Sequence, residues 1–238
     1  MAENNFGLTK SIEYLPEDPP IAVWTKLRTS QTKGSGSCDW TELFQPLVHA
    51  VGHKETVWAR MADNPDVVLL ATLWWTTSEL RDFEASPSAQ LYRETLQREG
   101  IIPVSIHETI YGFAHWFQRL KYSFTQIFWV YFPAPVDKSL QSQVSKLVGI
   151  RPPAFGPGVP LKEHFQTHLP VLHWATEPEV LHGTEARLLL WPHFWRNRER
   201  AEYRHEPYAQ KRFIERLEEL GPVEWKEEIY DFAKIPKL

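Results

Sequence analysis

The chain has 238 residues, a length that allows one large domain or two small ones. Lys and Arg total 26 and Asp and Glu total 30, and this net charge of −4 excludes the basic footprint of a nucleic-acid or anionic-membrane partner. The single cysteine, Cys38, excludes an internal disulfide and a thiolate metal cage built by one chain. The sequence has neither a signal-peptide pattern nor an apolar stretch of membrane-spanning length, so we expect a cytoplasmic protein.

The first half of the chain predicts the element order βαββαβ. The expected elements are a strand at 21–27, a helix at 39–51, strands at 57–61 and 67–75, a helix at 76–100 and a strand at 103–113. Capping-box pairs mark both helix starts, Asp39 with Glu42 and Thr76 with Glu79. Pro46 is expected to shorten the first helix and Pro87 to break the second, which then restarts because proline is well placed at a first helical position.

The second half repeats this order with one insertion. The expected elements are a strand at 124–132, a helix at 136–148, strands at 171–175 and 186–191, a helix at 196–220 and a strand at 223–232. The insertion at 149–170 is rich in proline and too long for a simple connection, so it is interpreted as a lid or as a structural packing arm.

An internal repeat connects the two halves. Trp75, Phe83 and Pro87 recur as Trp195, Tyr203 and Pro207, each 120 positions later, and the closing strand at 108–113 matches 227–232 at a spacing of 119. The predicted domains are an N-terminal extension at 1–19, a first ferredoxin-like half at 20–118 and a second half at 119–238.

A βαββαβ half with Trp at the end of its third strand, a capped helix, a proline break and a closing aromatic strand resembles the dimeric α/β-barrel superfamily. Within it, the nearest resemblance is to the antibiotic-biosynthesis-monooxygenase type. The resemblance implies an α+β fold in which two ferredoxin-like sheets pack face to face, here both from one chain. It also implies a choice among oxygenases that need no metal or flavin, haem-degrading enzymes, isomerases and duplicated relatives that hold haem.

The candidate site comes from comparing the third strand of each half. One face carries Val67, Leu69, Ala71, Leu73 and Trp75 in the first half, and Arg187, Leu189, Trp191, His193 and Trp195 at the matching places in the second. Polar substitution in the second half predicts that the working cavity lies there. The predicted catalytic residues are His193, His173, His205 and Arg187, and the predicted substrate-binding residues are Trp174, Trp191, Trp195 and Tyr203.

Histidines among tryptophan rings suit a general base that removes a phenolic or enolic proton, with Arg187 holding the resulting anion. The sequence favours His193 as that base. The resemblance implies that such an anion reacts directly with dioxygen in the cofactor-free monooxygenases, although the same cluster would also serve an isomerisation, dehydration or cyclisation. His107, near the end of the first half, is expected to be a surface histidine on a strand.

Two His-x-x-x-His pairs, His49 with His53 and His164 with His168, lack the accompanying carboxylates of a metal site and are interpreted as chance spacing.

No nucleotide-binding, serine-hydrolase or thiol-redox motif occurs, so no cofactor is expected, with haem as the alternative. The 11 Trp, 13 Phe and 8 Tyr are typical either of an aromatic core or of a site for a flat ligand, and composition by itself favours the core.

The sequence therefore predicts an enzyme of specialised metabolism that acts on an aromatic or polyketide-like substrate. It is expected to be a cofactor-independent monooxygenase, or an isomerase, cyclase or dehydratase on the same fold. The rival hypothesis is a non-catalytic barrel that binds a small ligand or haem, and a homodimer is left open.

Overall fold

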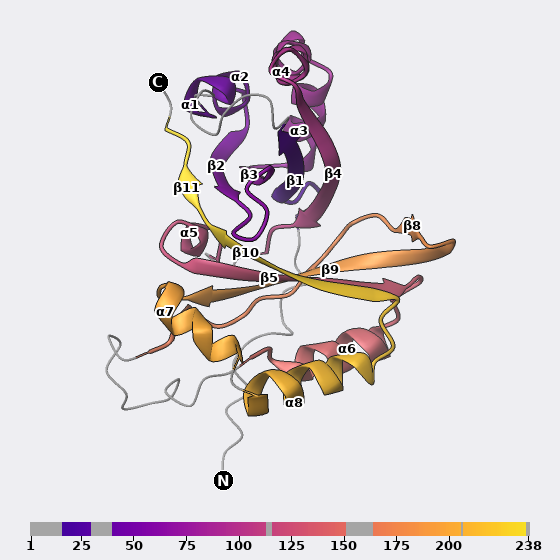
Figure 1. Ribbon diagram of the computed structural model, residues 1–238. Helices are drawn as coiled ribbons and strands as arrows, with labels where there is room; N and C mark the ends of the chain where they lie inside the picture. Colours follow the sequence, from indigo (N-terminus) through magenta and orange to yellow (C-terminus); the bar gives the residue numbers. More distant parts are fainter. Residues whose placement is uncertain (1–15, 30–39, 113–115, 151–163, 206, 237–238) are drawn as a thin grey trace.

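The computed structural model describes residues 16–29, 40–112, 116–150, 164–205 and 207–236 (Figure 1). These residues form two antiparallel sheets that face each other, each with helices on its outer side. The predicted capping residue Asp39, most of the predicted extension at 1–19, and residues 151–163 of the predicted insertion lie outside the described residues.

The first sheet has the strand order β11-β2-β3-β1-β4. Its strands are β1 (Ile21–Thr29), β2 (His53–Arg60), β3 (Val67–Trp74), β4 (Ile101–Ile110) and β11 (Ala233–Lys234). Its helices are α1 (Trp40–Leu43), α2 (Gln45–Val48), α3 (Thr77–Glu84) and α4 (Pro87–Arg98). The first predicted helix is therefore two short ones, and Pro46 lies in the first turn of the second.

The predicted start and break of the next helix are confirmed. The Thr76 side chain accepts a hydrogen bond from the Glu79 amide at 3.1 Å and so caps α3. Ser86 caps α4 by accepting from the Ala89 amide at 3.2 Å, and Pro87 is the first residue of that helix.

The second sheet has the order β10-β5-β9-β6, and two further short strands also pair with β9. Its strands are β5 (Phe124–Pro133), β6 (Gln166–His168), β7 (His173–Trp174), β8 (Glu179–Leu181), β9 (Thr184–Trp195) and β10 (Glu224–Asp231). Its helices are α6 (Lys138–Leu147), α7 (Arg198–Ala201), a 3-10 turn (Glu202–His205) and α8 (Pro207–Glu218), while α5 (Trp116–Leu120) precedes β5. The described end of the predicted insertion contains β6, an additional strand of this sheet.

The two sheets close on each other at both edges. An isolated bridge joins Met61 to Tyr230 on one side, and another joins Thr109 to Ala175 on the other. After β10 the chain crosses to the first sheet, where β11 pairs with β2 (Figure 1). The closing strand of each half thus meets the other half next to that half's second strand, which is β2 in the first half and β7 in the second. The predicted fold class of two tandem ferredoxin-like halves is confirmed.

Three apolar cores fill this architecture. One lies between the sheets and contains Trp24, Trp116, Trp129 and their neighbours. The second packs the first sheet against α1 to α4, and the third packs the second sheet against α6 to α8. Because helices cover one face of each sheet and the other sheet covers its second face, a strand can be buried on both faces. Every residue of β3 is buried in this way.

The repeat is present, but its predicted register in the third strand is wrong by one residue. Ile21 pairs with Trp74 in the first sheet, and Phe124 pairs with Trp195 in the second, so Trp74 is the counterpart of Trp195. Trp75 is 54% exposed. Because β3 is apolar on both faces, its sequence has no alternation that fixes which residues face the helices.

The predicted register of the closing strand is wrong by two residues. His107 pairs with Trp24, and Glu228 pairs with Ile127, so Glu228 rather than Lys226 occupies the place of His107. A slip of two residues leaves every side chain on its own face, and the polar pattern therefore does not reveal it.

Candidate functional site

Most of the predicted site residues lie on the helix-facing side of the second sheet. Trp191 and Trp195 are buried in the core against α6 to α8, and Trp174 and Tyr203 pack against the same core. His193 and Arg187 lie on this face of β9 by their alternation with the two tryptophans. His205 stands apart, because its side chain is 55% exposed and faces Glu202 at 3.6 Å.

His193 is completely buried and both of its ring nitrogens have partners. The Ile150 amide donates to Nε2 at 3.0 Å, which leaves the proton on Nδ1, where it is donated to the Trp191 carbonyl at 3.1 Å. Burial lowers the pKa of His193 to about 3, so the ring is neutral near pH 7. A Cβ at Gly149, whose φ is +73°, would lie 2.4 Å from Nε2.

Arg187 and His193 lie far apart along β9. The two residues are six positions apart, which corresponds to about 20 Å between their Cα atoms at a strand rise of about 3.3 Å per residue. This distance gives little support to a pair in which Arg187 holds an anion formed at His193. The roles of both residues stay predictions.

His173 lies on the opposite face of the second sheet, in the space between the sheets. It pairs with Leu190, which belongs to the inner core, whereas His193 faces the helices. The His173 ring centroid is 4.0 Å from that of Trp116, which stacks on Trp24 at 5.5 Å and 5°. Burial lowers the pKa of His173 to about 3. The structure therefore separates His173 from the rest of the predicted cluster.

A second polar group in the same inter-sheet space was not anticipated. Lys26 binds both carboxylate oxygens of Glu228 at 2.7 and 2.8 Å, and its Nζ lies 3.6 Å from the centre of the Trp129 ring. Tyr230 donates to the Glu228 carboxylate at 2.8 Å. Burial lowers the pKa of Lys26 to about 8, although Glu228 acts in the opposite direction. The sequence signal was a lone lysine inside an apolar strand.

His107 belongs to this group, and the expectation that it is a surface histidine is wrong. It is 8% exposed, its ring centroid is 5.7 Å from that of Trp129, and its Nδ1 is 3.6 Å from Glu179. Burial is the main cause that lowers the pKa of His107 to about 4, followed by the charges of Lys26 and Lys226. Its strand is at a sheet edge, but β7 and the second sheet cover this part of it.

Four ring nitrogens between the sheets are buried and lack a hydrogen-bond partner among the residues that the structure describes. They are Nε1 of Trp116, Nε1 of Trp129, Nε2 of His107 and Nε2 of His173. Unpartnered buried polar atoms are rare in folded proteins and commonly face a water or a ligand. The two indoles can donate to an oxygen, and the two neutral imidazoles can accept a proton.

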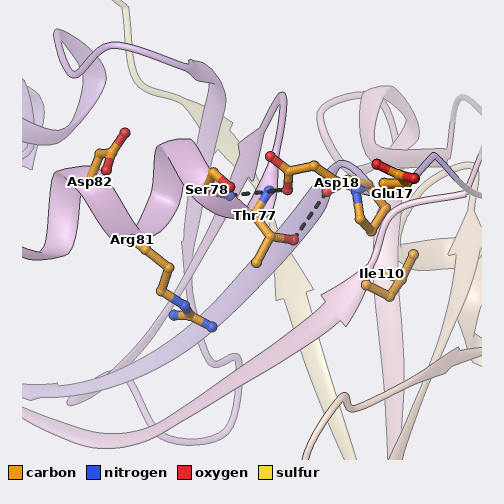
Figure 2. A pocket seen from close by; sticks show the side chains of 8 residues that line it. Glu17, Asp18, Thr77, Ser78, Arg81, Asp82 and Ile110 are labelled. Atoms are coloured by element: carbon orange, nitrogen blue, oxygen red, sulfur yellow. Dashed lines mark hydrogen bonds between the residues drawn. The ribbon is translucent and has the colours of Figure 1, made fainter.

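A surface groove of about 520 Å³ lies in the first half, at the start of α3 (Figure 2). Asp18 accepts hydrogen bonds from the amides of Thr77 and Ser78 at 2.8 and 3.1 Å. Arg81, on the same wall, is paired with Glu84 and Glu108. These charges already have partners, so the groove offers less chemistry than the inter-sheet space. The predicted working cavity of the second half stays a prediction.

The described residues contain no group of three or more His, Cys, Asp or Glu side chains that could hold a metal ion. His193 does not fit as an axial ligand of haem, because its Nε2 already accepts the Ile150 amide and Gly149 lies against it. We therefore assign no step to haem. No helix among the described residues has the length and apolar character needed to cross a membrane.

No protein-family model and no curated protein matches the sequence. Solved structures do match. An anthrone oxidase-like protein aligns with a TM-score of 0.57 and 15% identity over 93% of this chain and 96% of that one. A candidate monooxygenase from Fusobacterium nucleatum subsp. nucleatum aligns with a TM-score of 0.55 and 8% identity over 93% and 94%. A candidate chlorite dismutase aligns with a TM-score of 0.51 and 10% identity over 90% and 95%.

At these identities the comparisons establish the fold alone. They extend over both halves of the chain, in agreement with the bridges that join the two sheets. The chain has the fold of the dimeric α/β-barrel proteins, with both ferredoxin-like halves in one polypeptide.

Proposed function

We propose that this protein is an enzyme that binds a flat phenolic or enolic molecule between the two sheets and removes a proton from it, as the first step of a monooxygenase reaction. The observation that carries the proposal is the set of four unpartnered ring nitrogens in that space. Two are indole donors suited to an oxygen atom and two are neutral imidazoles suited to a proton.

His173, one of the predicted catalytic histidines, is the proton acceptor that the geometry supports. Its imidazole is neutral because burial lowers its pKa, and its Nε2 has no partner among the described residues. The adjoining rings of Trp116 and Trp24 make its surroundings aromatic, which suits an aromatic substrate. His193 faces the other side of the sheet and has both nitrogens engaged, so its predicted role as the base has less support.

The resemblance to an anthrone oxidase-like protein supports an oxidation by dioxygen. In such a reaction the base removes a proton from the CH₂ group that lies opposite the enolisable carbonyl in the central ring, and the electron-rich anion reduces dioxygen. One oxygen atom becomes the new carbonyl, and the other leaves as water with the two hydrogens of the CH₂ group. The protein's contribution would be to position the ring, exclude water and hold the proton.

The test is oxygen uptake with anthrone as the probe, with anthraquinone formation followed by absorbance. We expect His173→Gln to keep the folded state and to lose about 10²–10⁴-fold in kcat, the usual contribution of a positioned base. His182→Gln is the matched control, because the His182 side chain is 72% exposed.

Uptake no faster than that of anthrone in buffer would refute the monooxygenase proposal. Equal rates for His173→Gln and the control would refute the role of His173, and a loss confined to His193→Gln would transfer that role to His193. A Soret band in the purified protein would favour the haem-binding alternative instead.

A further inference from the structure

We propose that His107 and Glu179, contributed by different sheets, form an acid–base pair that accepts the proton of a phenolic ligand and holds its anion beside Trp129. This inference rests on the proposed function, because it adds a second proton acceptor and the charge of the ligand to the same inter-sheet space. His107 lies on β4 of the first sheet, and Glu179 lies on β8 of the second, so the pair exists only when the halves are packed together.

The geometry assigns the two nitrogens of His107 different roles. Nδ1 lies 3.6 Å from the Glu179 carboxylate, so a proton on Nδ1 is favoured there and the lone pair remains on Nε2. That Nε2 is buried and has no hydrogen-bond partner among the described residues. A carboxylate beside one nitrogen of an imidazole whose other nitrogen has no partner resembles the arrangement of a general base.

The charges around His107 are balanced before the ligand arrives. The charges of Lys26 from β1 and Lys226 from β10 act on it, and the Glu179 carboxylate from β8 lies beside its Nδ1. Glu228 from β10 pairs with Lys26, so two lysines oppose two glutamates. The phenol of Tyr131 from β5 is near the same carboxylates, which add to the effect of burial in raising its pKa. When a neutral phenol binds and gives its proton to His107, an imidazolium and a phenolate form together, so the balance of the group is unchanged.

The groups beside His107 suit a ring that carries one acidic oxygen. The Trp129 ring is close both to His107 and to the Lys26 ammonium, and its Nε1 has no partner among the described residues, so it can donate to that oxygen. The Glu179 side chain is 42% exposed, whereas that of His107 is 8% exposed, so the group extends from the interior to solvent.

The proton-transfer step conserves atoms and charge. The ligand O–H bond breaks and its electron pair stays on the oxygen. The proton forms a bond with Nε2 of His107, while the proton on Nδ1 remains directed at Glu179. The indole N–H of Trp129 then donates to the phenolate oxygen, and the imidazolium of His107 balances its charge.

The test uses 4-nitrophenol, whose phenolate absorbs visible light and whose neutral form does not, at about pH 6, where the free compound is mostly neutral. We expect the wild-type protein to bind it as phenolate and to produce the visible band. We expect His107→Gln to weaken phenolate binding by about tenfold or more, the range of a charge-assisted hydrogen bond, and Glu179→Gln to weaken it less.

The matched control is His182→Gln, which alters an exposed histidine that also faces a glutamate, at 2.8 Å from Glu224. Circular dichroism melting verifies that each variant is folded. If His107→Gln is unfolded, the partly exposed Glu179→Gln variant decides the outcome. No visible band with the wild-type protein, or the same affinity in the folded variants as in the control, overturns the inference.

This readout separates the inference from the proposed function. Phenolate binding that depends on His107, in a protein that does not oxidise anthrone, would refute only the monooxygenase reaction. Anthrone oxidation that depends on His173, in a protein that binds 4-nitrophenol without ionising it, would refute only the role of the His107 and Glu179 pair.

Discussion

Three buried histidines are neutral in this fold, and their protonation is linked to folding. Burial lowers the pKa of His107 to about 4 and those of His173 and His193 to about 3, below the ordinary value of 6.5. Between about pH 3 and 6.5 the unfolded chain binds protons at these residues that the folded protein does not bind. The free energy of unfolding therefore falls as the pH falls through this range.

We expect each of these histidines to remove about 2 kcal/mol of stability between pH 7 and pH 5. The measurement is the free energy of unfolding in urea at both pH values. His193→Gln should lower the free energy of unfolding at pH 7, because it disturbs the hydrogen bonds of the Ile150 amide and the Trp191 carbonyl. It should also reduce the change in that free energy between pH 7 and pH 5. An unchanged pH dependence in His193→Gln would contradict a neutral buried imidazole in the folded protein.

At the scale of elements, the C-terminal segment links the two sheets. Lys234 pairs with Val57 in β2, and the Ile235 amide donates to the Thr56 carbonyl at 3.1 Å. The Ile235 side chain is 3% exposed and packs in the core between the first sheet and its helices. The end of the second half thus completes a core of the first half.

We expect Ile235→Ala to lower the free energy of unfolding by about 2–5 kcal/mol, because it removes a buried side chain and leaves a cavity. Val180→Ala is the control, since Val180 is 75% exposed and should change stability by less than about 0.5 kcal/mol. Chemical denaturation measures both. Equal effects of the two substitutions would mean that β11 does not stabilise the first half.

The elements were predictable where a local signal marks them. The cap at Thr76 and the restart at Pro87 depend only on neighbouring residues, and both are confirmed. The register of β3 was not predictable, because a strand buried on both faces shows no alternation. The inter-sheet group was missed for another reason: Lys26 and Glu228 are 202 residues apart and meet only through the pairing of the two sheets.

The sequence predicted part of the candidate site, again only where a local pattern marks it. Alternation along β9 correctly placed His193 and Trp191 on one face. Alternation gives a face but no hydrogen-bond partners, so the partners of both His193 nitrogens were visible only in three dimensions. His173 was identified by residue type, yet its strand is too short for its sequence to fix the face.

At the scale of the whole molecule, the ion pair of Lys26 and Glu228 connects one half with the other. Lys26 belongs to β1 of the first sheet and Glu228 to β10 of the second, and both are nearly buried. Burying two charges is costly, and the cost is offset only while both partners are present. The pair therefore penalises packings of the two sheets that would separate the charges.

We expect Glu228→Gln to lower the free energy of unfolding by about 3–5 kcal/mol, because it leaves the Lys26 ammonium buried without its counter-charge. The double substitution Lys26→Met with Glu228→Gln should recover much of that loss, since no unpaired charge then remains. Urea denaturation of the two single variants and the double variant gives the coupling energy. If the loss of the double variant equals the sum of the losses of the two single variants, the two residues do not act as a pair. The alignment of the halves then depends on the apolar inner core and the edge bridges alone.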